Sequence, residues 1–577
     1  MTSEPDLGAA QMRPGAELLQ AGRAMVVDWT LGRNLFLDTH QVASEAAYKR
    51  AAKGRIMQHA HIGFRSLDRT VAAMARLHDA AQARDVRIDR FGITLDWSMG
   101  YPPEHRASAG RGTGIVLSSP EDFRRITNAS PAAAHFGDFM LGLPGALHNT
   151  QAAIAAGATA IGNLGQYFTF RLPFWDDDVA TTEATVTALG LIAAQPGEIL
   201  VHSNLDDGFA GLFLDVTSAF GMMLIEKHIV EDLIGARASF CFGHHFSEPL
   251  TRAAFHAALA QEVDTPGTMI FGNTVAYRGA EAANYASLAN YLLADICALT
   301  RAPTGHAINP VPVTENQRIP DVEEILDAQC FAARLAEHAA GHARLADDEM
   351  IDAMAQKLIR GGRGFARAAL TGLAERGVDT SDPAALMLAI RRLGAKRMEA
   401  LWGQGSYRQP LVPADWAQEL DQMAQGWVSA NRQTGQNLTH LHVVLGTTDV
   451  HEHGAYLVRQ ALEGLGVRVT DAGVALDPEV LVARACAAEA DAIAISTYNG
   501  IALNYARAVR DALRAQDCQI AVLIGGKLNQ IAENSNSDLP VDVTQELAGL
   551  DVSPCQGLDD MLQTLQRLTL QGETGRD

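Results

Sequence analysis

The chain has 577 residues, of which 47% are hydrophobic and 20% charged, a balance typical of a globular protein with room for several domains. Its formal net charge of −21 argues against a nucleic-acid partner, because a phosphate backbone is bound through Lys and Arg. No apolar run approaches the roughly 18 residues of a membrane span, and residues 1–22 lack a signal-peptide pattern, so no membrane partner is expected. The six scattered cysteines form no C-x-x-C pair, which indicates a reducing cytoplasm and argues against a zinc cage or a disulfide framework.

Eight short strand-like runs recur across residues 26–320, separated by Ala-rich segments with helical spacing. The runs are Arg55–Gly63, Arg90–Asp96, Ala134–Gly142, Ala158–Gly165, Glu198–Leu205, Arg237–Gly243, Thr268–Thr274 and Gly305–Val311. Strands that alternate with helices predict parallel βα units, and eight units are the count of a (β/α)8 TIM barrel. We therefore expect an α/β barrel over 26–320, after a loosely held segment over 1–25. An open parallel sheet of similar length is the alternative.

The pattern changes twice more along the chain. Residues 321–402 are helical in pattern, and the Gly-, Gln- and Pro-rich range 403–438 indicates a linker. From 439 to 577, strand-like and helical runs alternate again. The strand-like runs are 441–446, 467–473, 491–496, 519–526 and 550–554. This pattern predicts a flavodoxin-like, doubly wound domain, in which ligands bind outside the carboxyl ends of the strands.

A short motif follows the first strand of this last domain. Asp449, His451 and Gly454 form an Asp-x-His-x-x-Gly pattern between that strand and a helix. A histidine on such a loop can offer neutral imidazole to a transition metal, while the aspartate holds the proton of the other ring nitrogen. Glycine at 454 leaves room where a bulky group must pass close to the helix.

Small and polar residues follow two later strands of the same domain. Ser496 and Tyr498 come after the third strand, and Gly525 and Gly526 after the fourth. Each feature alone is compatible with an ordinary turn. Together, in this order, they predict a slot beside the first loop.

The stretch from Leu441 to about Leu568 resembles the cobalamin-binding domain shared by B12-dependent mutases and methionine synthase, through DVHEHG, Ser496-Thr497-Tyr498 and LIGGK. The resemblance implies that His451 is the lower axial ligand of cobalt, and so the metal-binding residue, with Asp449 as its partner. It also implies that Ser496, Gly525 and Gly526 line the pocket of the displaced nucleotide tail. Tyr498 stands where the family has leucine, and His453, without a family role, is expected to face solvent.

Residues from about 140 to 320 resemble, more distantly, the catalytic subunit of glutamate mutase. The similar runs are ALHNTQAAIAAGATAIGNLGQYFTFRLPF, HSNLDDGFAG through GMMLIEKHIV, and MIFGNT. The resemblance implies that the barrel mouth closes over adenosylcobalamin, with Glu315 near the ribose of the cofactor. Leu147 and Leu164 stand where that family has an arginine and an acidic residue, so glutamate itself is not the expected substrate.

Candidate substrate residues lie on the loops after the barrel strands, where barrel function is found. The candidates are Gln166, Arg171, Asn204, Asp206 and His244. Arg171 could clamp a carboxylate in place of the missing arginine, or it could form a rim salt bridge with Asp176–Asp178. For the Asp206-Asp207 and His244-His245 pairs, hydrogen bonding to substrate or adenosyl group is favoured over a metal cluster.

These observations lead to one hypothesis and two rivals. The first is an adenosylcobalamin-dependent carbon-skeleton mutase, acting as a homodimer on a small carboxylic acid other than glutamate. The second is a corrinoid-dependent methyltransferase, for which residues 321–402 would be the helical cap. The third is a non-enzymatic cobalamin sensor, which the absence of a visible output module disfavours.

Overall fold

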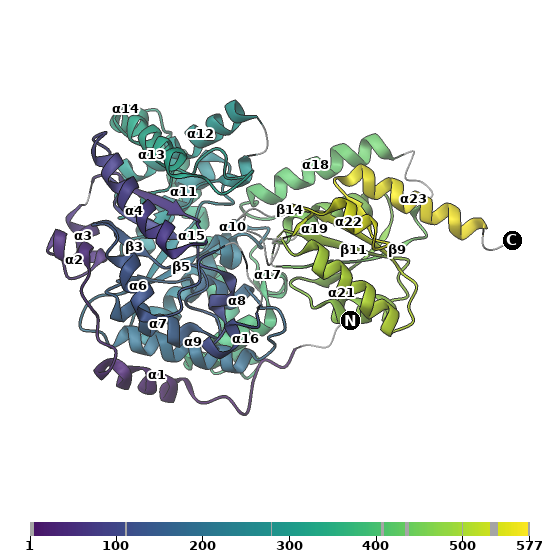
Figure 1. Cartoon of the computed structure of the whole chain (residues 1–577), viewed down its shortest axis with the longest axis horizontal. Helices are drawn as coiled ribbons and strands as arrows, with labels where there is room; N and C mark the ends of the chain where they lie inside the picture. The colour runs from purple at the N-terminus through teal and green to yellow at the C-terminus, as the bar shows by residue number, and fades with distance from the viewer. Residues whose placement is uncertain are drawn as a thin grey trace. The chain divides into compact units, whose positions relative to one another are not determined.

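The computed structural model describes two compact units of the chain. The described residues are 5–52, 54–109, 112, 114–277, 280–405, 409–432, 438–449, 451–498, 500–530 and 541–574, with side chains described up to 570. One unit comprises residues up to 169 and 177–415, and the other comprises residues 170–176 and 416 onward. Figure 1 shows the chain coloured from purple at its start to yellow at its end.

The N-terminal unit is built on short parallel strands, one at each of the eight predicted runs. The strands are β1 (Met57–Ile62), β2 (Arg90–Ile93), β3 (Ala133–His135), β4 (Ala160–Ile161), β5 (Leu200–Asn204), β6 (Arg237–Cys241), β7 (Met269–Ile270) and β8 (Ala307–Ile308). They form two sheets of order β3-β2-β1-β8-β7 and β4-β5-β6. Single parallel bridges, Phe136 to Ile161 and Phe242 to Ile270, join the neighbouring ends of the two sheets. The predicted α/β fold with parallel strands is confirmed.

Helices follow the strands of this unit and cover the sheets (Figure 1). The longer ones are α4 (Leu67–Gln82), α6 (Pro120–Thr127), α7 (Ala146–Ala155), α9 (Asp178–Ala193), α10 (Val216–Lys227), α11 (Pro249–Glu262) and α12 (Glu281–Arg301). The shorter ones are α2 (Leu35–His40), α3 (Glu45–Ala51), α5 (Pro103–Arg106), α8 (Gly165–Thr169), η1 (Met25–Val27), η2 (Trp97–Gly100), η3 (Asp206–Ala210), η4 (His228–Ile234) and η5 (Thr274–Ala276). Side-chain caps set several starts: Ser66 accepts from Arg69 N–H before α4, and Ser119 with Asp122 forms a capping box before α6.

Part of the range expected to be loosely held is packed. Helix α1 (Gly15–Ala24) lies against α9, and Leu18 and Leu19 are buried. A Cβ added at Gly22 would lie 2.0 Å from the Thr187 carbonyl oxygen, so glycine permits this close approach.

The helical range after β8 packs on the N-terminal unit. It comprises α13 (Val322–Ala336), α14 (Ala339–Ala343), α15 (Asp348–Glu375), α16 (Pro383–Leu393) and α17 (Ala395–Trp402). Helix α15 lies against α10 and α11. A Cβ at Gly221 of α10 would be 2.7 Å from the carbonyl oxygen of Gly362, so glycines let the α10 and α15 backbones meet. The helices of the range 321–402 therefore belong to the N-terminal unit.

The C-terminal unit holds a five-stranded parallel sheet of order β10-β9-β11-β12-β15. Its elements are β9 (His442–Thr447), α19 (His453–Gly464), β10 (Arg468–Gly473), α20 (Pro478–Ala487), β11 (Ala492–Thr497), α21 (Ala502–Ala515), β12 (Ala521–Gly526), α22 (Thr544–Ala548), β15 (Ser553–Cys555) and α23 (Leu558–Thr574), with an antiparallel pair β13 (Asn529–Gln530) and β14 (Val541–Asp542). One apolar core lies between the sheet and α20 and α21, and a second between the sheet and α19 and α23. Helices on both faces of a 2-1-3-4-5 sheet give the predicted doubly wound fold.

Two features of this region differ from the sequence expectations. The range 403–438, expected to be a linker, contains helix α18 (Asp415–Asn431), whose buried Trp416, Ala424 and Val428 recur at helical spacing. Cys486 and Cys518, 32 residues apart, form a disulfide with a Cα–Cα distance of 6.5 Å. Their spacing gave no indication of this pair.

Among the helices that the structure describes, none combines the length and the apolar character needed to cross a bilayer.

Candidate functional site

The loop after β9 brings together the Asp449 carboxylate and the His451 imidazole. Oδ1 of Asp449 accepts hydrogen bonds from the backbone N–H of His451 at 2.9 Å and from its ring Nδ1 at 2.5 Å. Oδ2 accepts from the Thr448 hydroxyl at 3.0 Å and from the Tyr498 backbone N–H at 3.1 Å. Both carboxylate oxygens are therefore fully used inside the protein.

These contacts determine the charge of Asp449. Burial alone would raise the pKa of this carboxyl, but the hydrogen bonds and the charge of His451 outweigh burial and hold the pKa below its ordinary value. An ionised carboxylate can only accept, so Nδ1 of His451 must carry the proton of the ring.

His451 is left with one ring nitrogen for another partner. Its side chain is 47% exposed, and no residue in the described part of the chain hydrogen-bonds Nε2. With the proton on Nδ1, Nε2 carries a lone pair whenever the imidazole is in its uncharged form. This is the state in which a histidine binds a transition metal, with a carboxylate behind it.

Small residues continue this site along the carboxyl edge of the sheet. The strand register places Ser496 of β11 between Thr447 of β9 and Gly525 of β12. Gly454, in the first turn of α19, faces Ser496, because a Cβ at 454 would lie 2.7 Å from the Ser496 Oγ. A larger residue at 454 would therefore fill the space between α19 and β11.

Gly526, at the end of β12, is required by the conformation of the backbone. Its φ is +101°, and a Cβ there would lie 2.3 Å from the carbonyl oxygen of Thr497. Only glycine adopts this conformation without strain, so the backbone path at the end of β12 depends on it. Gly525 is less restricted, because a Cβ added there would lie 3.2 Å from its nearest neighbour, the Cys555 carbonyl oxygen.

The neighbouring histidine of the motif has a different environment. His453 is half-buried, and its ring stacks on Trp416 of α18 with centroids 4.5 Å apart and planes 17° apart. The expectation that His453 faces solvent is therefore wrong. The motif separates the two histidines, since one ring is exposed beside Asp449 and the other packs against a helix.

Comparison with known proteins gives this unit a family. Residues 441–545 match the family model described as B12 binding domain. The C-terminal unit contains a B12-binding domain. Among solved structures, the chain is similar to a crystal structure titled as a novel cobalamin-binding protein from Desulfitobacterium hafniense DCB-2, at 22% identity over 27% of this chain and 84% of that one, with a TM-score of 0.20. The comparison with curated proteins found no significant match.

The residues of the B12-binding domain fit the cofactor that its family name implies. Cobalt takes imidazole nitrogen as a ligand, and the half-exposed Nε2 of His451 offers one. The space that a Cβ at Gly454 would fill lies beside Ser496, where the nucleotide tail was predicted to pass. The predicted site residues Asp449, His451, Gly454, Ser496, Gly525 and Gly526 thus lie along one edge of one sheet.

The N-terminal unit carries its own cluster of polar residues at strand ends. Asp206, two residues after the end of β5, accepts from the backbone N–H groups of His244 at 3.0 Å and His245 at 3.1 Å, which follow β6. Burial would raise the pKa of Asp206, but the hydrogen bond and charge of His245 and the charge of His244 lower it. Asp206 and His244, two of the predicted substrate residues, are therefore neighbours.

A second carboxyl group of this cluster is in the opposite state. Asn163 Nδ2 donates to Oδ2 of Asp207 at 2.8 Å and to Oδ1 of Asp138 at 3.3 Å, so it links the loops after β3, β4 and β5. Burial, the nearby Asp138 and the nearby Asp206 raise the pKa of Asp207 well above its ordinary value. Burial also raises the pKa of Asp138. The pKa values of this pair are therefore shifted upward, whereas that of Asp449 is shifted downward.

The other predicted substrate residues are in structural roles or apart from the cluster. Gln166 accepts from the Phe139 N–H at 2.8 Å, and Asn204 accepts from the Asp206 N–H at 3.2 Å. Arg171 lies in the segment 170–176 that groups with the C-terminal unit, and it donates to the carbonyl of its neighbour Phe170. Glu315 is exposed in the turn after β8.

Sequence reasoning missed Asp138 and Asn163, as well as a set of buried histidines inside the parallel sheets. His59, His135 and His202 are buried, and His61 beside them is half-buried. Burial lowers the pKa of His61 to about 4 and that of His202 to about 3, so both rings are neutral. The alternation of His59 and His61 in β1 was the available signal for an inward-facing pair. In the described residues, no group of three or more His, Cys, Asp or Glu is arranged to hold a metal ion.

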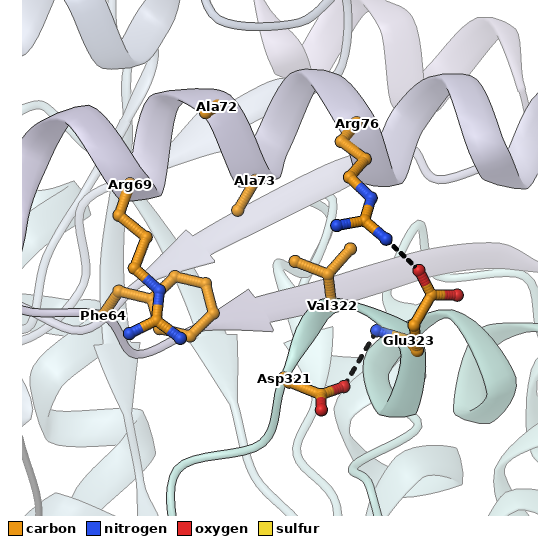
Figure 2. Close-up of a pocket in the computed structure, with 8 residues that line it drawn as sticks. All are labelled: Phe64, Arg69, Ala72, Ala73, Arg76, Asp321, Val322 and Glu323. Atoms are coloured by element: carbon orange, nitrogen blue, oxygen red, sulfur yellow. Dashed lines mark hydrogen bonds and ion pairs between the residues drawn. The ribbon is translucent and has the colours of Figure 1, made fainter.

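A cavity of about 330 Å³ lies elsewhere on this unit, between α4 and the start of α13 (Figure 2). The guanidinium of Arg69 lies 3.9 Å from the centre of the Phe64 ring, and Arg76 pairs with Glu323 across the opening. None of the predicted site residues lines this cavity.

Proposed function

We propose that this protein is an adenosylcobalamin-dependent carbon-skeleton mutase that rearranges a small carboxylic acid other than glutamate. The observation that carries the proposal is the half-exposed His451 ring, with Nδ1 held by Asp449 and Nε2 facing outward in a B12-binding domain. His451 would be the cobalt ligand, and Asp449 would fix its tautomer.

The proposal includes a closed (β/α)8 barrel for the N-terminal unit. The bridges from Phe136 to Ile161 and from Phe242 to Ile270 support closure, because they connect both pairs of free sheet ends with parallel pairing. In such a barrel the substrate binds at the carboxyl ends of the strands. The cluster of Asp138, Asn163, Asp206 and Asp207 lies on the loops at those ends.

The residues of the chain would have distinct tasks in this enzyme. Bound adenosylcobalamin would supply an organic radical that abstracts hydrogen from the substrate. Ser496, Gly454 and Gly525 would leave room for the nucleotide tail. The buried loops after β3, β4 and β5 would orient the substrate and exclude water, which is the main contribution of a protein to radical chemistry.

The cobalt ligand is tested by spectroscopy of the Co(II) form. In wild type, the electron paramagnetic resonance spectrum should show hyperfine coupling to one protein nitrogen, and His451→Ala should abolish it. His453→Ala is the matched control, since it removes a histidine two residues away that packs on Trp416. Coupling that persisted in His451→Ala would refute the ligand assignment.

The reaction class is tested by reconstitution in the dark without oxygen. The protein is offered adenosylcobalamin and methylcobalamin side by side, and the retained corrinoid is identified by mass spectrometry. Retention of the adenosyl form supports the mutase and justifies a screen of branched and linear acids. Retention of methylcobalamin alone supports the methyltransferase. Retention of neither corrinoid by folded protein would refute both.

A further inference from the structure

Tyr498 contacts both members of the Asp449–His451 pair. Its backbone N–H donates to Oδ2 of Asp449 at 3.1 Å. Its ring lies against the His451 imidazole, with centroids 4.4 Å apart and planes tilted by 36°. The contacts come from different strands, because Tyr498 follows β11 and His451 follows β9.

We propose that Tyr498 is a positioning residue, which holds the His451 ring in the orientation that directs Nε2 toward a ligand. This inference rests on the proposed role of His451 in binding cobalt. It assigns the tyrosine ring to the histidine, and not to the nucleotide tail that a leucine contacts in the family that this segment resembles.

The argument starts from the freedom of an exposed imidazole. The hydrogen bond from Nδ1 to Asp449 fixes one atom of the ring, but the ring can still swing about that bond. A second contact on the ring face removes this freedom. Among the described residues, Tyr498 is the aromatic side chain that lies against His451.

The position of Tyr498 suits this task. Its side chain is 53% exposed, so its ring is not held there by burial in the core. Aromatic rings at this separation attract each other in tilted arrangements. A ligand ring oriented before binding costs less conformational entropy when the cofactor arrives.

The two contacts of Tyr498 can be separated by substitution. The hydrogen bond to Asp449 comes from the backbone and is retained by any residue other than proline. Tyr498→Leu therefore keeps that hydrogen bond and removes the ring together with its hydroxyl, while Tyr498→Phe keeps the ring and removes only the hydroxyl. The pair of variants isolates the ring contact.

The first test uses the protein without corrinoid. In NMR spectra of histidine-labelled protein, the His451 ring protons should move on Tyr498→Leu, because the ring current of the tyrosine is lost. Tyr498→Phe should leave them near their wild-type positions. His453, stacked on Trp416, is the internal reference and should not move. Unchanged His451 signals in Tyr498→Leu would overturn the proposal.

The second test compares cobalamin with cobinamide, which lacks the nucleotide tail. If the ring acts through His451, Tyr498→Leu should weaken the binding of both corrinoids by about three- to tenfold, with Tyr498→Phe close to wild type. A loss confined to cobalamin would identify a tail contact and overturn the positioning role. Failure of the wild type to bind either corrinoid would refute the proposed function, and the NMR comparison would then decide the role of Tyr498 by itself.

Discussion

Both units bury carboxyl groups near the ends of parallel strands, and the pKa values of these groups shift in two directions. The pKa is lowered at Asp449 of the B12-binding domain and at Asp206 of the N-terminal unit, and it is raised at other carboxyl groups of the N-terminal unit. Asp449 of the B12-binding domain receives four hydrogen bonds from N–H and O–H donors, and its pKa is lowered. In the N-terminal unit, burial and neighbouring carboxyls raise the pKa of Asp207, and burial raises that of Glu226 to about 7.

The comparison shows that hydrogen-bond donors, and not the depth of burial, decide whether the pKa of a buried carboxyl is raised or lowered. Asp449 is 6% exposed and Glu226 is 1% exposed, so both are buried. Glu226 has the Ser203 hydroxyl as a donor at 2.5 Å, and its Oε1 has no hydrogen-bond partner in the described structure. A buried carboxyl without enough donors keeps its proton, whereas one surrounded by donors stays charged and can orient an imidazole.

The largest expected effect concerns stability at Glu226. The folded protein holds this proton up to about pH 7, whereas an unfolded chain releases it near pH 4.3, so stability falls as pH rises between these values. Glu226→Gln should remove this loss and stabilise the protein at pH 8 by about 3 kcal/mol. Urea unfolding of wild type and variant at pH 5 and pH 8 measures this change in the free energy of unfolding. Glu375→Gln, on the exposed face of α15, is the control. An unchanged pH slope would show that Glu226 is ionised when folded.

The next effect concerns the carboxylate that stays charged. Asp449→Ala removes the acceptor behind His451 and should weaken corrinoid binding by about 10- to 100-fold. Asp449→Asn keeps an oxygen acceptor without its charge and should fall between alanine and wild type. Calorimetric titration gives the affinities, and Glu463→Ala at an exposed site on α19 is the control. Equal affinities for Asp449→Ala and wild type would remove Asp449 from the site.

The smallest effect tests the space beside Ser496. Gly454→Ala gains helix propensity, but its Cβ would lie 2.7 Å from the Ser496 Oγ, so we expect a net loss of about 1 kcal/mol. Adding Ser496→Ala leaves the next atom of that side chain at 3.9 Å and should restore the melting temperature. Corrinoid binding should stay weak in the double variant because the Cβ still occupies the slot. Recovery of binding together with stability would place the tail elsewhere.

Local patterns were sufficient to predict the strands and the motif of the B12-binding domain. The runs at 441–446, 467–473, 491–496, 519–526 and 550–554 overlap β9, β10, β11, β12 and β15 in that order. Once their order was predicted, Ser496 and Gly525 had to come side by side, because parallel strands share one carboxyl edge. His451 and Asp449 are two residues apart, so their contact is local.

Contacts between distant residues could not be predicted from those patterns. Asn163 meets Asp138 and Asp207 only after three separate loops are folded, and nothing in the sequence near 138 indicates this. The His453 ring was expected in solvent because Trp416, its partner, lies in a helix that composition assigned to a linker. Arg171 was predicted to be a carboxylate clamp on a loop of the barrel, but the segment 170–176 groups with the other unit.

The glycine contact between α10 and α15 bears on how such a chain can be shortened or recombined. Gly221 and Gly362 let two helices touch along their backbones, although one belongs to the strand-bearing region and the other comes after it. A truncation after residue 320 would remove α15 and expose the face of α10 that packs against it. The interchangeable module of this protein therefore begins near residue 416, and a chimaera that exchanges corrin carriers should be joined there.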